Sequence, residues 1–134
     1  MRFAILPHAG DWRDAQLYRE IERYRQPLDG ADVLFPIAGD QADTQRGLAI
    51  TPEAVMLSAY YQDRGETFVR IYETAGGPAR TTIELPFAPA GATVCNMLGE
   101  PMADERTITI ASHTLKLDLG AWEIATLRID RGDA

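Results

Sequence analysis

The stretch "FVRIYETAGGPARTTIELPF", residues 68–87, decides the fold class of this chain. Its two halves alternate apolar and polar residues, which is the pattern of β-strands that bury one face. In the second half this alternation places Ile83, Leu85 and Phe87 on the same side. Between the halves, the Gly-Gly-Pro at residues 76–78 is the strongest turn signal in the chain. The stretch therefore predicts two short strands joined by a turn.

The same alternation recurs on both sides of this stretch. Further strand candidates lie at residues 54–61, 91–98, 106–111, 114–119 and 121–129. Short alternating strands at intervals near ten residues are typical of an antiparallel sandwich. The sequence therefore predicts a mostly β fold, an antiparallel immunoglobulin-like β-sandwich with one N-terminal α-helix.

Two of these candidates predict which side chains face inward. "AVMLSAYY", residues 54–61, alternates so that one face carries Val55, Leu57, Ala59 and Tyr61. "TLKLDL", residues 114–119, places its three leucines on one face and the charged Lys116 and Asp118 on the other. We expect the leucines to face the core.

The last candidate, "AWEIATLRI" at residues 121–129, changes phase partway along. The first phase holds Trp122 and Ile124, and the second holds Leu127 and Ile129. An extra residue in a strand shifts the alternation by one. We therefore expect a bulge near Ala125 and Thr126.

The front of the chain differs in pattern. "GDWRDAQLYREIERYRQP", residues 10–27, repeats apolar side chains at the three- and four-residue spacing of a helix face. Asp11 is placed to cap this helix and Pro27 to end it. The alternating "RFAIL", residues 2–6, is strand-like, and "DVLFP", residues 32–36, is another short strand candidate.

Composition limits the class of partner and the compartment. The chain has 134 residues, the size of one domain, and a net charge of -7, which repels a nucleic-acid backbone and an anionic membrane surface. We therefore expect no nucleic-acid and no membrane partner. No stretch reaches the roughly twenty apolar residues that span a bilayer. Cys95 is the only cysteine, which favours a reducing compartment and hence the cytoplasm.

Few residues suggest chemistry. His8 and Asp11 could share a proton or a metal ion, but we favour a structural interpretation in which Asp11 caps the helix and His8 shapes the preceding turn. A zinc site needs three or four ligands, and the only other histidine is His113. Cys95 lies in an apolar strand candidate, so we expect a buried residue and not a reactive thiol. We therefore expect no catalytic residue, no metal site and no cofactor in this chain.

The aromatic residues suggest one binding function. Tyr60 and Tyr61 are adjacent, so they point to opposite faces of a strand and one of them can be exposed as a platform for sugar stacking. Trp12 and Trp122 each lie in apolar patterning, which favours core packing.

Four segments together resemble one known family. They are "FAILPHAGDWRDAQLYREI" (residues 3–21), "AVMLSAYYQDRGETFVRIYETAGGPARTTIELPF" (residues 54–87), "CNMLGEP" (residues 95–101) and "WEIATLRI" (residues 122–129). In this order they resemble the C-terminal β-domain of glycoside hydrolase family 38 α-mannosidases. The most specific parts are "LPHAGDW" and the run from "LSA" to "VRIYETAGGPA".

The resemblance implies that the chain is the last part of a longer enzyme, which hydrolyses terminal α-mannosides with retention by a carboxylate nucleophile and a zinc ion. In that family both belong to an upstream catalytic domain, and no motif here matches them, so no catalytic residue is carried over. The resemblance also implies that "LPHAGDW" is a structural or interdomain motif, in which Asp11 caps the helix, Trp12 packs and His8 lies in the turn.

Two main hypotheses follow. In the first, residues 1–134 form a single non-catalytic accessory domain whose partner is the catalytic domain of the parent α-mannosidase, with mannosides as a further ligand, and the chain alone is inactive. In the second, the chain is a stand-alone carbohydrate-binding β-sandwich with Tyr60 or Tyr61 as the stacking residue. A third alternative makes His8 and Asp11 part of a site that another chain completes.

Overall fold

The computed structural model describes residues 3–26, 47–103 and 106–132. The chain divides into two compact units. Residues Met1–Asp43 form the N-terminal unit, and Thr44–Ala134 form the sandwich unit. No helix in the described ranges is both long and apolar enough to cross a membrane.

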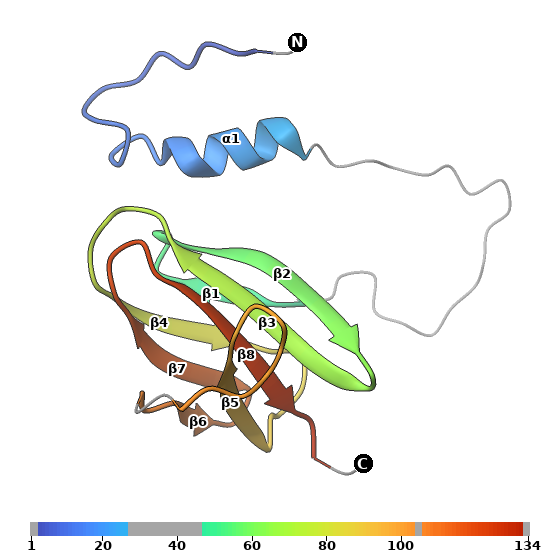
Figure 1. The fold of residues 1–134 in the computed structure, drawn as a ribbon. Helices are drawn as coiled ribbons and strands as arrows, with labels where there is room; N and C mark the ends of the chain where they lie inside the picture. Colours follow the sequence, from blue (N-terminus) through green and yellow to red (C-terminus); the bar gives the residue numbers. More distant parts are fainter. Residues whose placement is uncertain (1–2, 27–46, 104–105, 133–134) are drawn as a thin grey trace, which may run out of the picture. The chain divides into compact units, whose positions relative to one another are not determined.

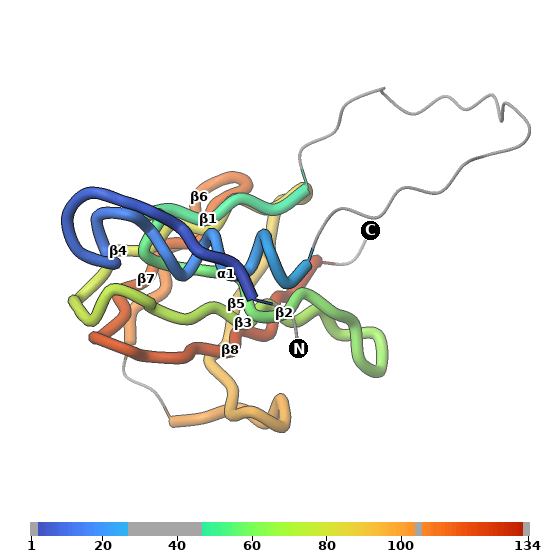
Figure 2. The backbone as a smooth tube through the Cα atoms, turned by 90° about the horizontal axis from the view of Figure 1, so that it is seen from above, coloured from blue at the N-terminus to red at the C-terminus, as the bar shows by residue number. Residues whose placement is uncertain are grey.

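The described part of the sandwich unit contains two antiparallel sheets (Figure 1). Its strands are β1 (Ala49–Thr51), β2 (Val55–Asp63), β3 (Glu66–Glu73), β4 (Ala79–Glu84), β5 (Gly91–Cys95), β6 (Thr109–Ala111), β7 (Thr114–Leu119) and β8 (Ile124–Asp130). One sheet has the order β1-β4-β7-β6 and the other the order β2-β3-β8-β5. Figure 2 shows β3 and β8 along one layer and β4 and β7 along the other. The predicted mostly β sandwich is confirmed.

The core lies between the two sheets and takes side chains from both. Ile71 and Leu127 come from one sheet, Ile83 and Leu115 from the other, and all four are fully buried. Each such side chain stabilises the fold by roughly 1.5–3 kcal/mol through burial. The three leucines of β7 face this core while Lys116 and Asp118 face outward, as their alternation predicts.

The Gly-Gly-Pro turn joins the sheets to each other. β3 belongs to one sheet and β4 to the other, so residues 74–78 carry the chain across the end of the sandwich. Gly76 has a φ of 79°, a left-handed conformation that glycine adopts without steric cost. The predicted turn is confirmed, and it sets the topology of the whole unit.

The predicted common face of β2 is wrong. The register of β2 against β3 shifts between Leu57 and Ala59, so Ser58 forms a bulge. Before the bulge Leu57 pairs with Ile71 of the inward face, and after it Tyr61 pairs with the outward-facing Phe68. The bulge therefore puts Val55 and Leu57 on the opposite face from Ala59 and Tyr61.

The predicted bulge in the last strand is also wrong. β8 pairs with β3 in unbroken register from Ile124 to Ile129, and Ala125, Leu127 and Ile129 all face the core. No phase change is needed, because Ile124 and Trp122 are exposed. The prediction that Trp122 packs in the core is therefore wrong as well.

Among its described residues, 3–26, the N-terminal unit contains one helix, α1 (Leu17–Arg25), which is shorter than the expected 10–27. The chain enters α1 through Gln16, whose φ of 47° is left-handed and interrupts the helix at this point. Residues 3–6 do not form a strand, although their sequence alternates. The strand candidate at residues 32–36 lies outside the described residues.

Candidate functional site

The loop that follows β5 is held in a fixed shape by Asn96. Its Oδ1 accepts hydrogen bonds from the backbone N–H groups of Leu98 (2.9 Å) and Glu100 (3.0 Å), and its Nδ2 donates to Glu100 Oε2 (2.8 Å). A side chain that binds its own backbone in this way stabilises a tight turn. The turn carries Met97 and Leu98, whose side chains are 61% and 82% exposed.

This loop is anchored to the outer face of the β2-β3-β8-β5 sheet. Arg70 of β3 donates from Nη2 to the Met97 carbonyl (3.0 Å) and from Nε to Thr126 Oγ1 of β8 (3.0 Å). Gly99 lies against Phe68, since a Cβ atom added at Gly99 would be 3.2 Å from the Phe68 ring. The orange segment after β5 in Figure 1 is this loop. Met97 and Leu98 are therefore exposed on a braced backbone.

Two further exposed apolar side chains, Ile124 and Trp122, lie near the same face. Met56, Tyr72 and Ile124 are partners across β2, β3 and β8, so they form one row. Within the row, the Tyr72 hydroxyl donates to Met56 Sδ (3.8 Å), and Ile124 is 57% exposed. Trp122, two residues before Ile124, is 58% exposed. We call Met97, Leu98, Trp122 and Ile124 the outer-face patch.

The backbone of Trp122 is held in an unusual conformation. Its φ of 60° is left-handed, which costs a residue with a side chain on the order of 1–2 kcal/mol. Its N–H donates to Glu73 Oε2 (3.0 Å), and its indole lies against Gly76, where an added Cβ would be 2.5 Å from Cζ2 of the ring. The turn that carries Trp122 is thus fixed by contacts with the β3–β4 connection.

Glu73 is the residue that joins these two turns. Its carboxylate is almost fully buried, with 3% of the residue exposed, and accepts N–H bonds from Ala75 (2.7 Å), Gly76 (2.8 Å) and Trp122. Burial by itself would raise the pKa of Glu73, but the backbone N–H groups of Trp122, Ala75, Gly76 and Gly77 outweigh it and hold the pKa below its ordinary value. The carboxylate is therefore ionised at neutral pH and serves as a structural anion.

A second carboxylate braces the turn that carries Trp122. Glu123 Oε2 accepts the N–H of Gly120 (2.6 Å), and its Oε1 forms an ion pair with Arg106. Both side chains of this pair are partly buried. Within the outer-face patch, the backbone that carries Trp122 is therefore fixed by two carboxylates, and the backbone that carries Met97 and Leu98 is fixed by Asn96 and Arg70.

Sequence reasoning overlooked Glu73, although a signal was present. In the alternation of β3 the inward positions are Val69, Ile71 and Glu73, so a carboxylate stands where a buried apolar residue is expected. It immediately precedes a glycine-rich turn, whose backbone N–H groups are natural partners for a buried anion. A charged residue at an inward position beside such a turn indicates a structural carboxylate.

His8 and Asp11 have separate partners in the structure. His8 is exposed, with Nδ1 3.3 Å from the Ala9 carbonyl oxygen. Asp11 Oδ1 accepts the backbone N–H groups of Asp14 (3.1 Å) and Arg13 (2.7 Å), which hold the pKa of Asp11 below its ordinary value. Asp11 therefore caps the turn at residues 12–16.

This position corrects the predicted cap of the helix. α1 begins at Leu17, six residues after Asp11, and has no side-chain cap of its own. The left-handed Gln16 separates the capped turn from the helix. Trp12 lies in the capped turn, partly buried, with Tyr18 edge-on at 6.3 Å between ring centroids and the Arg13 guanidinium 4.3 Å from its ring centre.

The two adjacent tyrosines of β2 differ in their surroundings. Tyr61 stacks on Phe68 of β3 with ring centroids 5.1 Å apart and planes 13° from parallel. Tyr60 points to the other face and is 41% exposed. Tyr61 therefore lies on the outward face of the sheet and Tyr60 on the other, and their role in sugar stacking stays a prediction.

The described residues contain no group of three or more His, Cys, Asp or Glu side chains that could hold a metal ion. Cys95 is buried, as its apolar strand predicts, and pairs in register with Thr126.

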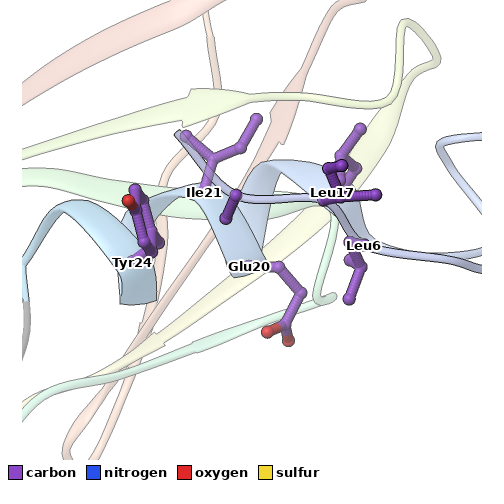
Figure 3. Close-up of a pocket in the computed structure, with 7 residues that line it drawn as sticks. Leu6, Leu17, Glu20, Ile21 and Tyr24 are labelled. Carbon is purple, nitrogen blue, oxygen red and sulfur yellow. The ribbon is translucent and has the colours of Figure 1, made fainter. Parts of the chain in front are cut away.

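An apolar groove lies within the N-terminal unit. It has a volume of about 320 Å³ and is lined by Ala4, Ile5, Leu6, Leu17, Glu20, Ile21 and Tyr24. Figure 3 shows Leu6 beside Leu17 and, further along α1, Ile21 and Tyr24. The Tyr24 hydroxyl donates to the Phe3 carbonyl (3.1 Å), which fastens residues 3–6 along the helix.

Comparison with known proteins identifies the sandwich unit. The model of the glycosyl hydrolases family 38 C-terminal beta sandwich domain matches residues 54–127. This range runs from the residue before β2 to the middle of β8 and covers more than half of the chain. No curated protein matches the chain. The family match and the two-sheet fold agree, and the chain belongs to the family of C-terminal β-sandwich domains of family 38 glycosyl hydrolases.

Proposed function

We propose that this chain is the non-catalytic accessory domain of a retaining, zinc-dependent α-mannosidase and that it packs against the catalytic part of that enzyme. The family match over residues 54–127 carries this proposal. The nucleophile and the zinc ion are assigned to the catalytic domain, as the family resemblance implies. Residues 1–134 act as one accessory domain, and the enzyme works in the cytoplasm.

The carboxylate chemistry of the sandwich supports a structural role. A glycoside hydrolase needs a carboxylic acid that can give up a proton near neutral pH and a second carboxylate near it. Glu73, the most buried carboxylate described, has a lowered pKa and is surrounded by backbone N–H donors. Its partners belong to two turns, so Glu73 fixes the shape of the sandwich.

The outer-face patch supports the packing role. Four exposed apolar side chains on a braced backbone resemble the rigid apolar anchors that dominate protein interfaces, among which tryptophan is enriched. The fixed backbones lower the ordering entropy that binding must overcome. We therefore assign the outer-face patch to the contact with the catalytic domain.

Two measurements test the accessory role. An antibody raised against the chain should detect, in an extract of the source organism, a polypeptide several times larger than 14.8 kDa. The purified chain with added zinc should not hydrolyse an aryl α-mannoside. Zinc-dependent hydrolysis by the pure chain would refute the proposal.

The packing surface is tested separately. Leu98→Asp should weaken association with the catalytic polypeptide of the same organism at least about tenfold, because a charge replaces an apolar anchor. Thr109→Asp is the control, since Thr109 is an exposed residue of β6 in the other sheet and pairs with the outward-facing Lys116. Equal affinities of the two variants would move the interface away from the outer-face patch.

A stand-alone carbohydrate-binding module is the second candidate, favoured by the exposed ring of Tyr60. Aromatic rings stack on sugar faces when one side is open to solvent. Titration with mannose oligosaccharides should then change the tyrosine or tryptophan fluorescence in a saturable way, and Tyr60→Ala should abolish the change. A native polypeptide near 14.8 kDa would favour this candidate.

A further inference from the structure

The first described residues of the N-terminal unit alternate like a strand in sequence but pair with no sheet in the structure. Phe3 and Ile5 are 79% and 83% exposed, although they are large and apolar. Within the described ranges, no backbone–backbone hydrogen bond reaches residues 3–8. An extended segment with apolar side chains and open backbone groups is a template for pairing with another strand.

One edge of this segment is already used. Phe3 offers its carbonyl to the Tyr24 hydroxyl of α1. In an extended chain the N–H and C=O groups of successive residues point to opposite sides. With Phe3 bound to the helix, a strand formed by residues 3–6 would turn the groups of Phe3 and Ile5 to the helix side and those of Ala4 and Leu6 to the open edge.

The segment has defined ends. Pro7 has no N–H and cannot continue a hydrogen-bonded ladder. After it, Gly10 with a φ of 71° and the capped turn at Asp11 lead the chain back into α1. An added strand would therefore end at Leu6.

The helix beside this segment also leaves apolar surface uncovered. No residue of α1 is buried, and Ile21 and Tyr24 are both exposed on the side that lines the groove. The charged side chains of α1 pair among themselves, with ion pairs from Arg23 to Glu20, which borders the groove, and from Arg25 to Glu22. The unit thus presents an apolar side that its own described residues do not cover.

The family match indicates which polypeptide could cover it. The match begins at residue 54, so residues 3–26 lie outside the C-terminal sandwich by sequence as well as by structure. A domain named for its C-terminal position follows other parts of a family 38 enzyme, and those parts precede it in the chain.

We propose that residues 3–6, together with the apolar side of α1, add a strand to the edge of a β-sheet in the part of the glycosyl hydrolase that precedes the sandwich. Ala4 and Leu6 supply the backbone hydrogen bonds, and the Phe3 and Ile5 side chains pack on the apolar face of that sheet. The inference rests on the proposed accessory function. It assigns the N-terminal unit to a contact distinct from the outer-face patch.

Binding of the full chain to the rest of the enzyme tests the inference. The probe is the family 38 glycosyl hydrolase of the same organism, produced without its C-terminal sandwich. Calorimetric titration gives the affinity, and hydrogen exchange of the peptide that covers residues 3–8 reports on its amides. We expect these amides to become protected on binding.

Substitutions at Ala4 separate strand pairing from apolar contact. Ala4→Pro removes the open-edge N–H and should weaken binding at least about tenfold. Ala4→Val keeps the N–H and favours an extended backbone, so it should bind like the unmodified chain. Circular dichroism checks that both variants keep the sandwich folded. Equal binding by Ala4→Pro and Ala4→Val, or unprotected amides, would overturn the inference.

Two further outcomes would also overturn it. Self-association of the chain that protects the same amides without the enzyme would make a second copy the partner. Weakened binding by Leu98→Asp with unchanged binding by Ala4→Pro would remove this contact while the accessory function stands. Absence of any binding would refute the accessory function along with the inference.

Discussion

The two units of this chain differ in how their apolar residues are covered. In the sandwich unit, Ile71, Ile83, Leu115 and Leu127 are fully buried between two sheets. In the N-terminal unit, no residue of α1 is buried, and Ile5 remains 83% exposed. Burial of apolar surface is the main favourable term in folding. Burial within the sandwich unit therefore stabilises that unit by itself. The N-terminal unit has apolar side chains like those of an interface between domains, but its own described residues do not bury them.

The largest expected effect tests this contrast directly. Ile71→Ala should lower the free energy of unfolding of the sandwich by about 2–5 kcal/mol, because it leaves a cavity in a fully packed core. Ile21→Ala in α1 should change it by less than about 0.5 kcal/mol, since Ile21 is exposed and alanine favours a helix. Urea titration followed by circular dichroism measures both. Similar losses for the two variants would contradict the contrast.

The next effect concerns the carboxylate that joins the turns of the sandwich. Glu73→Gln should lower the free energy of unfolding by about 2–3 kcal/mol, because the amide places an N–H donor among backbone N–H donors and leaves some of them unpaired. Glu123→Gln, at the more exposed second brace, should cost less. A Glu73→Gln protein as stable as the unmodified chain would remove the structural role of this anion.

The same carboxylate predicts a pH dependence. The pKa of Glu73 is lower in the folded state than in the unfolded chain, so the unfolded chain binds its proton at a higher pH. The contribution of the ionised Glu73 to the free energy of unfolding is therefore fully present above the ordinary glutamate pKa. It is lost as the pH falls through the lowered pKa of the folded state. Urea midpoints measured across this acid range should fall less steeply for Glu73→Gln. Parallel pH profiles would argue against the lowered pKa.

Much of the sandwich follows from local alternation, and the exceptions have physical causes. The strands at residues 66–73 and 114–119 repeat with period two, and their inward residues are buried as that period requires. The faces of β2 differ from the predicted alternation because a bulge at Ser58 shifts the register. A bulge depends on how β2 pairs with β3, and the local sequence pattern does not contain that pairing. Trp122 is exposed, contrary to its predicted core packing, because its backbone is held by Glu73, 49 residues earlier in the sequence.

The candidate site was less predictable than the fold. The apolar residues of the outer-face patch come from a loop, a turn and a strand, and only the fold places them near one sheet face. The sequence predicts that Met97 and Leu98 belong to the end of a strand. In the structure β5 ends at Cys95, and Asn96 holds the turn that follows. The residue type of Asp11 predicts a cap, whereas the left-handed Gln16 that separates Asp11 from α1 has no sequence signal.

Two glycines with similar backbones differ in whether they contact the Trp122 indole. Gly65 and Gly76 both have left-handed backbones, with φ of 85° and 79°. An added Cβ would meet open space at Gly65 but would lie 2.5 Å from the Trp122 ring at Gly76. Gly65→Ala should therefore cost about 1 kcal/mol of sandwich stability and Gly76→Ala about 2 kcal/mol. Equal losses in urea titration would mean that the indole moves aside without cost.

The smallest effect is expected in the N-terminal unit, where it changes local order and not the stability of the sandwich. Asp11→Ala removes the acceptor for the N–H groups of Arg13 and Asp14, so the turn at residues 12–16 loses its cap. Asp11→Asn is the matched control, because asparagine keeps the acceptor oxygen and loses the charge beside Arg13. Amide exchange of residues 12–16 should accelerate for Asp11→Ala alone, with the urea midpoint of the sandwich unchanged in both variants. Equal acceleration would assign the role of Asp11 to its charge, and a shifted midpoint would show that the sandwich depends on the turn after all.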